Sequence, residues 1–272
     1  MTCKRLHSRL PVMPLNDLDD RLKVFPDRQA LGETAAAEIA HRLRLILAEQ
    51  HHARMIFAAA PSQTETLAAL IRQPDIDWNR VTAFHMDEYL DLRPEAPERF
   101  GNWLRTALFD RLPFAAVHYI DTTGAETPQA SADRYAELLL EDPIDIVCLG
   151  IGVNGHLAFN DPPVADFADP QAVKPVSLDQ ACREQQVADG CFPALADVPA
   201  TAITVTIPTL MNAAHLFCMV PGALKADAVR ATVQEPLTIQ WPSTILRTHP
   251  SCTIYTDVHA AALLDQGIRT AP

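Results

Sequence analysis

The side chains best suited to chemistry in this sequence are a histidine and an aspartate that follow a glycine-rich turn. His156 and Asp161 come directly after the predicted strand 144–149 and the turn 150–155. A histidine accepts and donates protons near neutral pH, and a carboxylate partner fixes its tautomer. Because ligands of open α/β sheets bind beyond the carboxyl ends of the strands, we expect a site in this loop. Its Asn154 can hydrogen-bond His156 or a ligand hydroxyl but cannot act as an acid or a base.

The glycines of the same turn also match a nucleotide-binding pattern. Gly150, Gly152 and Gly155 spell G-x-G-x-x-G after an apolar run. That pattern needs a helix that opens at the last glycine, whereas Pro162 and Pro163 interrupt the segment within two turns. The pattern is therefore weak evidence for a dinucleotide, and we expect no cofactor.

Two adjacent carboxylates, Asp87 and Glu88, follow a second apolar run at 81–86. Neighbouring side chains at a strand end point to different sides, so one carboxylate can face a crevice while the other anchors the loop. A solvated acidic pair in a turn explains this segment equally well when it is taken alone. His85 shares a strand face with Asp87, but no third converging ligand can be identified, and we expect no metal.

A third segment offers a place for an anion. Ser62 and Glu65 form an S-x-x-E capping box ahead of an apolar helical pattern. The start of a helix presents free amide groups and the positive end of the dipole, which favour an anion such as phosphate. Ser62 and Gln63 are therefore candidate ligands, although capping boxes are common and this one alone favours a purely structural role.

A framework of strands has to position these groups. Short apolar, β-branched runs alternate with longer helical patterns, which is typical of a mostly parallel sheet covered by helices. The apolar runs predict strands at 55–59, 81–86, 117–120, 144–149, 202–207, 216–220 and 252–256. The helical patterns predict helices at 33–50, 64–72, 98–110, 129–141, 223–233 and 258–265.

The chain shows no internal repeat and no Gly/Ser linker. Its proline-rich segment 161–199 is more typical of a functional loop or lid than of a domain boundary. We therefore expect one α/β domain over residues 1–272, with residues 1–30 as an N-terminal extension.

The composition limits the partners of the protein. The formal net charge is −12, whereas a protein that binds nucleic acid needs a surplus of Lys and Arg. A small anionic ligand stays compatible with this charge, because a few local donors can outweigh it. No apolar stretch is long enough for a signal peptide or a membrane span. We therefore expect no contact with a membrane. Six cysteines are too few for a disulfide scaffold, so we expect a reducing cytoplasm.

Taken together, these segments resemble the glucosamine-6-phosphate deaminase/isomerase family, which shares a fold with 6-phosphogluconolactonase. The resemblance covers roughly residues 33–257 and rests on the segments 86–89 and 149–162 and on the pattern Thr204, Gly222, Lys225, Trp241, His249 and Pro250. It implies a Rossmann-like core with helices on both faces of the sheet. It also implies conversion of glucosamine 6-phosphate, or a close epimer, to a ketose 6-phosphate with release of ammonia. A sugar phosphate is then the expected partner, and a homo-oligomer is compatible with the sequence.

The resemblance implies roles for individual residues. Asp87 stands where the family has the base that takes the C2 proton and returns it to C1, and His156 where it has the acid–base group of ring opening. Asp161 stands where the family usually has a Glu that orients this histidine, and Lys225 where it contacts the phosphate. The expected catalytic residues are Asp87, His156, Asp161 and Asn154, and the expected substrate-binding residues are Ser62, Gln63, Glu88, Gly155, Arg183 and Lys225.

The sequence departs from the family pattern at several points. Asn154 stands where many members have Asp, and Asp161 is one methylene shorter than the usual Glu. The family's glycine-rich phosphate loop is replaced by the Ala-Ala-Pro segment 59–61, which restricts the approach of a phosphate to the backbone. The family's phosphate-binding Arg falls at Gly190, and Arg183 is our candidate for the missing charge.

Two other functions stay open. A lactonase of the same fold would use His156 to activate water against the ester, but Asp87 has no obvious use in that reaction. A catalytically inactive protein that binds a sugar phosphate would not need Asp87, His156 and Asp161 together. An assay of all three activities separates these readings.

Overall fold

The computed structural model describes residues 21–124 and 126–265, which form two sheets and the helices around them. The large sheet has seven strands, and every neighbouring pair is parallel. In spatial order they are β1 (Leu22–Phe25), β10 (Cys252–Asp257), β9 (His215–Val220), β6 (Ile146–Leu149), β2 (Ala53–Phe57), β3 (Val81–His85) and β5 (Ala116–His118). The small antiparallel sheet consists of β4 (Asp87–Tyr89), β8 (Thr201–Val205) and β7 (Val173–Ser177).

The connections between the strands are mostly helical. The α-helices are α1 (Arg28–Glu49), α2 (Thr64–Ile71), α3 (Phe100–Ala107), α4 (Pro128–Leu140), α5 (Gln180–Ala188), α6 (Ile207–Met211) and α7 (Ala226–Gln234). Shorter 3₁₀ segments are η2 (Pro61–Gln63), η3 (Trp78–Arg80), η4 (Phe109–Arg111), η5 (Leu195–Asp197), η6 (Ala223–Lys225) and η7 (Pro242–Thr248). None of the helices in the described ranges is both long and apolar enough to cross a membrane.

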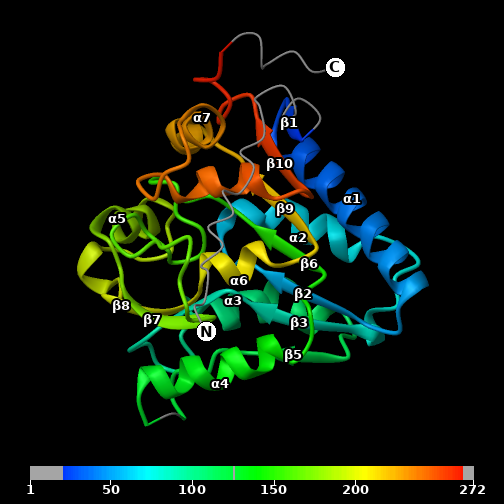
Figure 1. Ribbon diagram of the computed structural model, residues 1–272, viewed down its shortest axis with the longest axis horizontal. Helices are drawn as coiled ribbons and strands as arrows, with labels where there is room; N and C mark the ends of the chain where they lie inside the picture. Colours follow the sequence, from blue (N-terminus) through cyan, green and yellow to red (C-terminus); the bar gives the residue numbers. More distant parts are fainter. Residues whose placement is uncertain (1–20, 125, 266–272) are drawn as a thin grey trace, which may run out of the picture.

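Side chains alternate between the two faces of the large sheet. In β2, Ile56 packs in one apolar cluster, while Met55 and Phe57 pack in the other. The first cluster contains buried residues of α4, α6 and α7, and the second contains buried residues of α1, α2 and α3. Helices therefore cover both faces, and Figure 1 shows them around the central strands. The predicted α/β fold with a mostly parallel sheet is confirmed.

The small sheet supports one of the candidate segments. β4 is three residues long and pairs with β8, so that Asp87 lies opposite Thr204. The strand predicted at 202–207 is therefore β8 of the small sheet, which Figure 1 shows to the left of the large one. A strand as short as β4 exists only because β8 supplies its hydrogen-bond partners.

The start of the chain differs from the prediction. β1 and the first turn of α1 lie inside the segment 1–30, which was expected to be an extension, and β1 pairs with β10 at the edge of the large sheet. Asp27 caps α1, because its side chain accepts a hydrogen bond of 2.8 Å from the Ala30 N–H. Residues 22–30 are therefore part of the fold, and residues 1–20 lie outside the described residues.

Two further predictions need correction. The helix predicted at 258–265 is wrong, because the chain forms turns there and the Asp257 side chain accepts hydrogen bonds from the N–H groups of His259 and Ala260. The segment 161–199 was expected to be a loop, but it contains β7, α5 and η5. The expectation of a single domain stays a prediction.

Candidate active site

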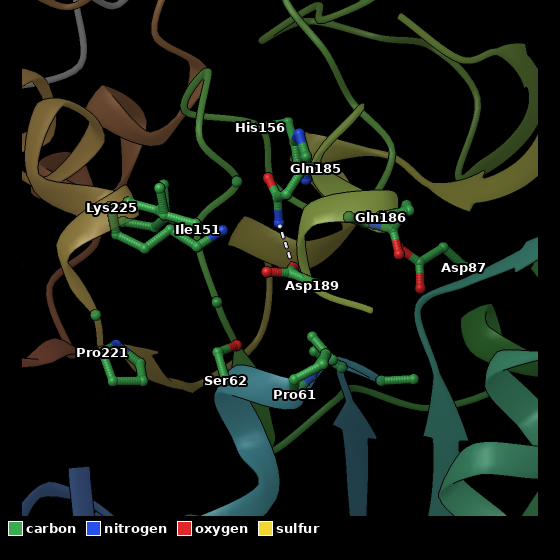
Figure 2. Close-up of a pocket in the computed structure, with 18 of the residues that line it drawn as sticks. Pro61, Ser62, Asp87, Ile151, His156, Gln185, Gln186, Asp189, Pro221 and Lys225 are labelled. Carbon is green, nitrogen blue, oxygen red and sulfur yellow. Dashed lines mark hydrogen bonds between the residues drawn. The ribbon is translucent and has the colours of Figure 1, made fainter. Parts of the chain in front are cut away.

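A cavity of about 290 Å³ lies at the carboxyl ends of the central strands, where the sequence predicted a site. Its walls come from the segments that follow β2, β3, β6 and β9, from α5, and from the start of α1. In the view of Figure 2, Asp87 and Lys225 lie on opposite sides of the cavity and His156 lies between them. The segments that follow β3, β6 and β9 therefore bring these three side chains to one cavity.

The imidazole of His156 is held on its Nδ1 side by two oxygen atoms. Nδ1 lies 2.8 Å from Asn154 Oδ1 and 2.9 Å from Asp161 Oδ1. The Asn154 amide donates to the same Asp161 oxygen at 2.9 Å, which links the three side chains. Because both neighbours of Nδ1 are acceptors, Nδ1 carries the hydrogen and Nε2 is the basic nitrogen of the neutral ring. The pairing expected from the sequence is confirmed, and Nε2 is available to a ligand.

The short side chain of Asp161 still reaches the histidine. Asp161 is fully buried, and burial alone would disfavour its charged form. The nearby His156 and the hydrogen bonds from His156 and Asn154 outweigh burial and lower the pKa of Asp161. Asp161 therefore stays ionised and fixes the orientation of the ring.

Two glycines of this turn have different roles. A Cβ at Gly152 would lie 2.1 Å from Cε1 of His156, so only glycine leaves room for the ring. Gly155 does not line the cavity, and its expected role in substrate binding is not supported. It has a positive φ of 81°, and its carbonyl accepts a hydrogen bond of 2.8 Å from the Ser243 N–H. Gly155 therefore shapes the loop.

Asp87 and Glu88 have opposite orientations. Asp87 lines the cavity, and its carboxylate accepts no hydrogen bond within the described part of the chain. Glu88 is 1% exposed and accepts hydrogen bonds from three backbone N–H groups, those of Tyr89, Phe100 and Gly101. The prediction that one carboxylate faces a crevice while the other anchors the loop is confirmed. The expectation that Glu88 binds substrate is not supported, because Glu88 holds the start of α3.

The environment of Asp87 makes its carboxylate a stronger base than usual. Burial raises the pKa of Asp87 well above its ordinary value, and the charges of Glu88 and Asp161 raise it further. A carboxylate in such a place accepts a proton from a weak acid more readily than a solvated one. Asp87 is therefore suited to abstract a proton.

The other side of the cavity carries Lys225 and Ser62, as the sequence predicted. Burial lowers the pKa of Lys225 to about 8, although the nearby Asp189 opposes this shift. Asp189 also lines the cavity, although no sequence pattern indicated this role. This side of the cavity therefore combines a lysine that loses its charge more readily than usual, Lys225, with the carboxylate of Asp189.

Arg28 supplies a second cation, which no sequence pattern predicted. It lines the cavity from the first turn of α1, and its Nε lies 2.9 Å from Glu65 Oε1. Its pKa is raised, first by the hydrogen bond with Glu65. The position of Arg28 after the N-cap Asp27 gives no sequence signal for this role, because only the tertiary fold brings α1 to the carboxyl ends of the strands.

Two predicted ligands point elsewhere. Arg183 does not line the cavity, and its Nη2 donates to the carbonyls of Leu195 and Val198, both at 2.8 Å. Gln63 is fully buried behind the cavity, where its amide lies 3.4 Å from the Leu149 carbonyl at the end of β6. Both side chains support the surrounding loops, so their expected contacts with substrate are corrected.

His85 is a structural residue. Its Nε2 accepts a hydrogen bond of 2.9 Å from the Ile120 N–H, and its Nδ1 lies 2.9 Å from the Asp87 carbonyl. Burial lowers the pKa of His85 to about 4, so the ring is neutral. Both nitrogens are used, and the histidine fixes the backbone that carries Asp87.

Comparisons with known proteins identify the family of the chain. Residues 26–255 match the family model of glucosamine-6-phosphate isomerases/6-phosphogluconolactonase. A glucosamine-6-phosphate deaminase of an Exiguobacterium species (strain AT1b) is 37% identical over 193 residues, which are 71% of this chain and 74% of that protein. A glucosamine-6-phosphate deaminase of Listeria welshimeri is 33% identical over 206 residues, 76% of this chain and 86% of that protein.

Solved structures give the same result. The structure of a monomeric glucosamine-6-phosphate deaminase superimposes with a TM-score of 0.81 at 25% identity and covers 89% of this chain and 99% of that one. The 6-phosphogluconolactonase of Trypanosoma brucei superimposes with a TM-score of 0.72 over 90% of this chain and 98% of its own, but at 18% identity it shows the fold alone. The chain belongs to the family of glucosamine-6-phosphate isomerases and 6-phosphogluconolactonases.

Proposed function

We propose that the protein converts glucosamine 6-phosphate, or a close epimer, into a ketose 6-phosphate and ammonia. One observation carries the proposal: Asp87, with a raised pKa, and His156, with its Nδ1 held by a carboxylate, line the same cavity. An isomerisation between aldose and ketose needs a base at carbon and an acid–base group at oxygen.

His156 opens the sugar ring in this scheme. Its Nε2 accepts the proton of the C1 hydroxyl, and the imidazolium returns a proton to the ring oxygen as the ring C–O bond breaks. Asp161 stabilises the imidazolium between the two transfers, because its carboxylate lies 2.9 Å from Nδ1. The product of this step is the open-chain aldehyde.

Asp87 then moves a proton between neighbouring carbons. Its carboxylate takes the C2 proton while the protonated C2 amine gives one proton to the aldehyde oxygen O1, which together give an enolamine. The Asp87 carboxyl group then returns its proton to C1. The C2 amine has then become an imine, and water hydrolyses the imine to the ketone and ammonia. The raised pKa of Asp87 favours both transfers, because the carboxyl group can hold the proton between them.

The opposite side of the cavity suits the phosphate group. Lys225 and Arg28 provide positive charge there, and the Ser62 hydroxyl provides a donor. Arg28 takes the part that was expected of Arg183. The pairing of Arg28 with Glu65 holds the guanidinium in place before a ligand arrives.

An assay of three substrates tests the proposal. The purified protein is incubated with glucosamine 6-phosphate, galactosamine 6-phosphate or 6-phosphogluconolactone, and the release of ammonia and of acid is followed. Ammonia from an amino sugar phosphate is the expected result. Acid from the lactone without ammonia would instead favour the hydrolase, and binding without any product would favour the inactive sugar-phosphate-binding protein.

We also infer a cytoplasmic location. The described residues include five cysteines, and all five are free thiols, which suits a reducing compartment. The expected homo-oligomer and the lack of a nucleic-acid partner stay predictions.

A further inference from the structure

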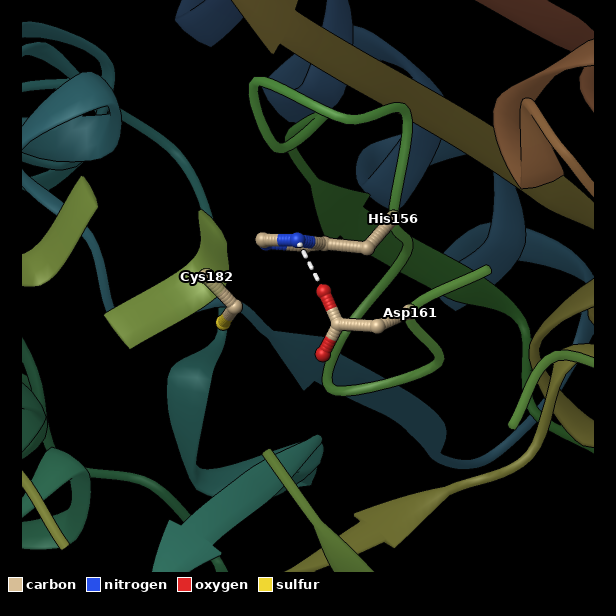
Figure 3. Close-up of side chains that lie close together, drawn as sticks. All are labelled: His156, Asp161 and Cys182. Atoms are coloured by element: carbon tan, nitrogen blue, oxygen red, sulfur yellow. Dashed lines mark ion pairs between the residues drawn. The ribbon is translucent and has the colours of Figure 1, made fainter. Parts of the chain in front are cut away.

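A thiol lies beside the pair of His156 and Asp161. One potential ligand atom from each of His156, Asp161 and Cys182 lies within 4.8 Å of the other two, and all three residues are buried. Cys182 belongs to α5, whereas the other two residues belong to the loop that follows β6. Figure 3 shows the thiol and the carboxylate on the same side of the imidazole ring. The three side chains therefore lie close together, beside the cavity that His156 lines.

One oxygen atom of this cluster has no strong hydrogen-bond donor among the described residues. Asp161 Oδ1 interacts with His156 and Asn154, whereas Asp161 Oδ2 is buried and accepts no hydrogen bond of normal geometry among the described residues. The Cys182 thiol approaches the same carboxylate and helps to lower the pKa of Asp161. A buried carboxylate oxygen without a donor is costly and uncommon. Its free lone pairs are available to a cation.

The charge of the region also favours a cation. The carboxylates of Asp87 and Asp161 are close enough to repel each other, and Glu88 adds a third negative charge nearby. A divalent ion in contact with Asp161 would offset this repulsion.

We propose that His156, Asp161 and Cys182 form an inhibitory Zn²⁺ site. An imidazole nitrogen, a carboxylate oxygen and a thiolate are the three donor types that protein zinc sites use, at distances of about 2.0 to 2.3 Å. The three ligand atoms lie within 4.8 Å of one another, so side-chain movements on the order of 1 Å can place all three at these distances from one shared ion. The ion binds Nδ1, the ring nitrogen on the side of Asp161, so the hydrogen of Nδ1 moves to Nε2. The Cys182 thiol gives up its proton to water when the sulfur binds the ion. A water molecule or a ligand atom from the cavity completes a four-coordinate site.

The consequence for catalysis is direct. An ion on this site engages His156 and Asp161, so the imidazole can no longer exchange protons with a sugar. Inhibition is therefore expected to be reversible, because a chelator that removes the ion restores the pair. The site itself does not depend on the proposed substrate, since the ligands belong to the free protein.

Metal binding tests the proposal without any substrate. The full chain, purified without a histidine tag and stripped with a chelator, is titrated with Zn²⁺ against a chromogenic competitor. We expect one Zn²⁺ per chain and a loss of affinity of at least about tenfold in Cys182→Ser. Cys191→Ser is the matched control, because Cys191 is a half-buried thiol outside the cluster and its loss should leave the affinity unchanged.

A second measurement covers the case in which Cys182→Ser does not fold. Co²⁺ added to the parent protein should produce a charge-transfer absorption from thiolate to cobalt, and the band should persist in Cys191→Ser. Absence of this band in the parent, or equal Zn²⁺ affinity in the parent and in folded Cys182→Ser, would overturn the proposal. Inhibition is measured separately, as the ratio of activity with and without Zn²⁺ for each variant, so a failure of the proposed reaction leaves the metal test intact.

Discussion

The neighbouring carboxylates of Asp87 and Glu88 point to opposite sides of β4 and have different surroundings. Burial raises the pKa of Asp87 and also that of Glu88. Glu88 is nevertheless stabilised by three backbone N–H groups and lies 3.7 Å from the Arg99 guanidinium, whereas the Asp87 carboxylate faces the cavity without a donor from the described chain. A raised pKa alone therefore does not identify the reactive group. The carboxylate that lacks internal partners is the one that is free to act on a ligand.

The largest expected effect is a loss of catalytic activity when the first of these two carboxylates, Asp87, is replaced. Asp87→Asn should lower kcat for ammonia release by about 10³-fold or more, because the amide cannot accept the C2 proton. Steady-state kinetics with glucosamine 6-phosphate provides the measurement, and circular dichroism checks the fold. A variant that keeps more than a tenth of the parent kcat would remove Asp87 from its proposed role.

The matched substitution on the other side of β4 should act on stability. The two carboxylate oxygens of Glu88 accept hydrogen bonds from three backbone N–H groups. Glu88→Gln replaces one of these oxygens by an NH₂ group, which cannot accept, so at least one N–H group at the start of α3 loses its acceptor. The expected cost is about 1 to 3 kcal/mol in the free energy of unfolding, measured with urea. The kcat of the folded variant should stay within a few-fold of the parent. A thousandfold loss of kcat with unchanged stability would erase the distinction between the two residues.

The pH dependence of stability sharpens the same comparison. Because the pKa of Asp87 is raised in the folded protein, the unfolded chain loses this proton at lower pH, and stability falls as pH rises from about 3.8 through the raised value. Asp87→Asn lacks this loss, so its stability relative to the parent should increase with pH, by about 1.4 kcal/mol for each unit of the upward shift. Thermal melts between pH 4 and pH 8 measure the difference. A difference that is constant across this range would contradict the assigned environment.

The smallest expected effect is a change of KM with pH that depends on the buried cation Lys225. The pKa of Lys225 is lowered to about 8, so its charge is lost as pH rises through that value, and KM for a sugar phosphate should then rise several-fold. Lys225→Arg should move this rise to higher pH, because an Arg stays charged. Asp189→Asn should move it to lower pH, since Asp189 helps to keep Lys225 protonated. An identical pH profile of KM in all three proteins would mean that Lys225 does not contact the anion.

Local patterns predicted those parts of the molecule that depend on local chemistry. Apolar runs located seven strands, because a buried strand needs such a run regardless of its neighbours. The opposite orientation of Asp87 and Glu88 followed from the alternation of side chains along an extended chain. The contact between His156 and Asp161 could also be predicted from the sequence, because both residues belong to one short loop.

The remaining features depend on how distant segments meet. Arg28 and Asp189 reach the cavity from α1 and from the end of α5, and no spacing along the chain connects them to the strand ends. Arg183 was expected at the site for its position in the sequence, but its guanidinium is turned toward the carbonyls of 195 and 198. β4 was missed because three residues carry too little pattern, and only the pairing with β8 makes them a strand.

The absence of a side chain at position 152 limits how this protein can evolve. The imidazole of His156 occupies the volume that even a methyl group at Gly152 would need, whereas a Cβ at Gly190 would meet no atom within 4 Å. Lineages that keep the histidine in this pose must therefore keep the glycine, and lineages that abandon it are released from that requirement. A bulkier residue at the position equivalent to 152 would, in a relative, require the imidazole to adopt another pose.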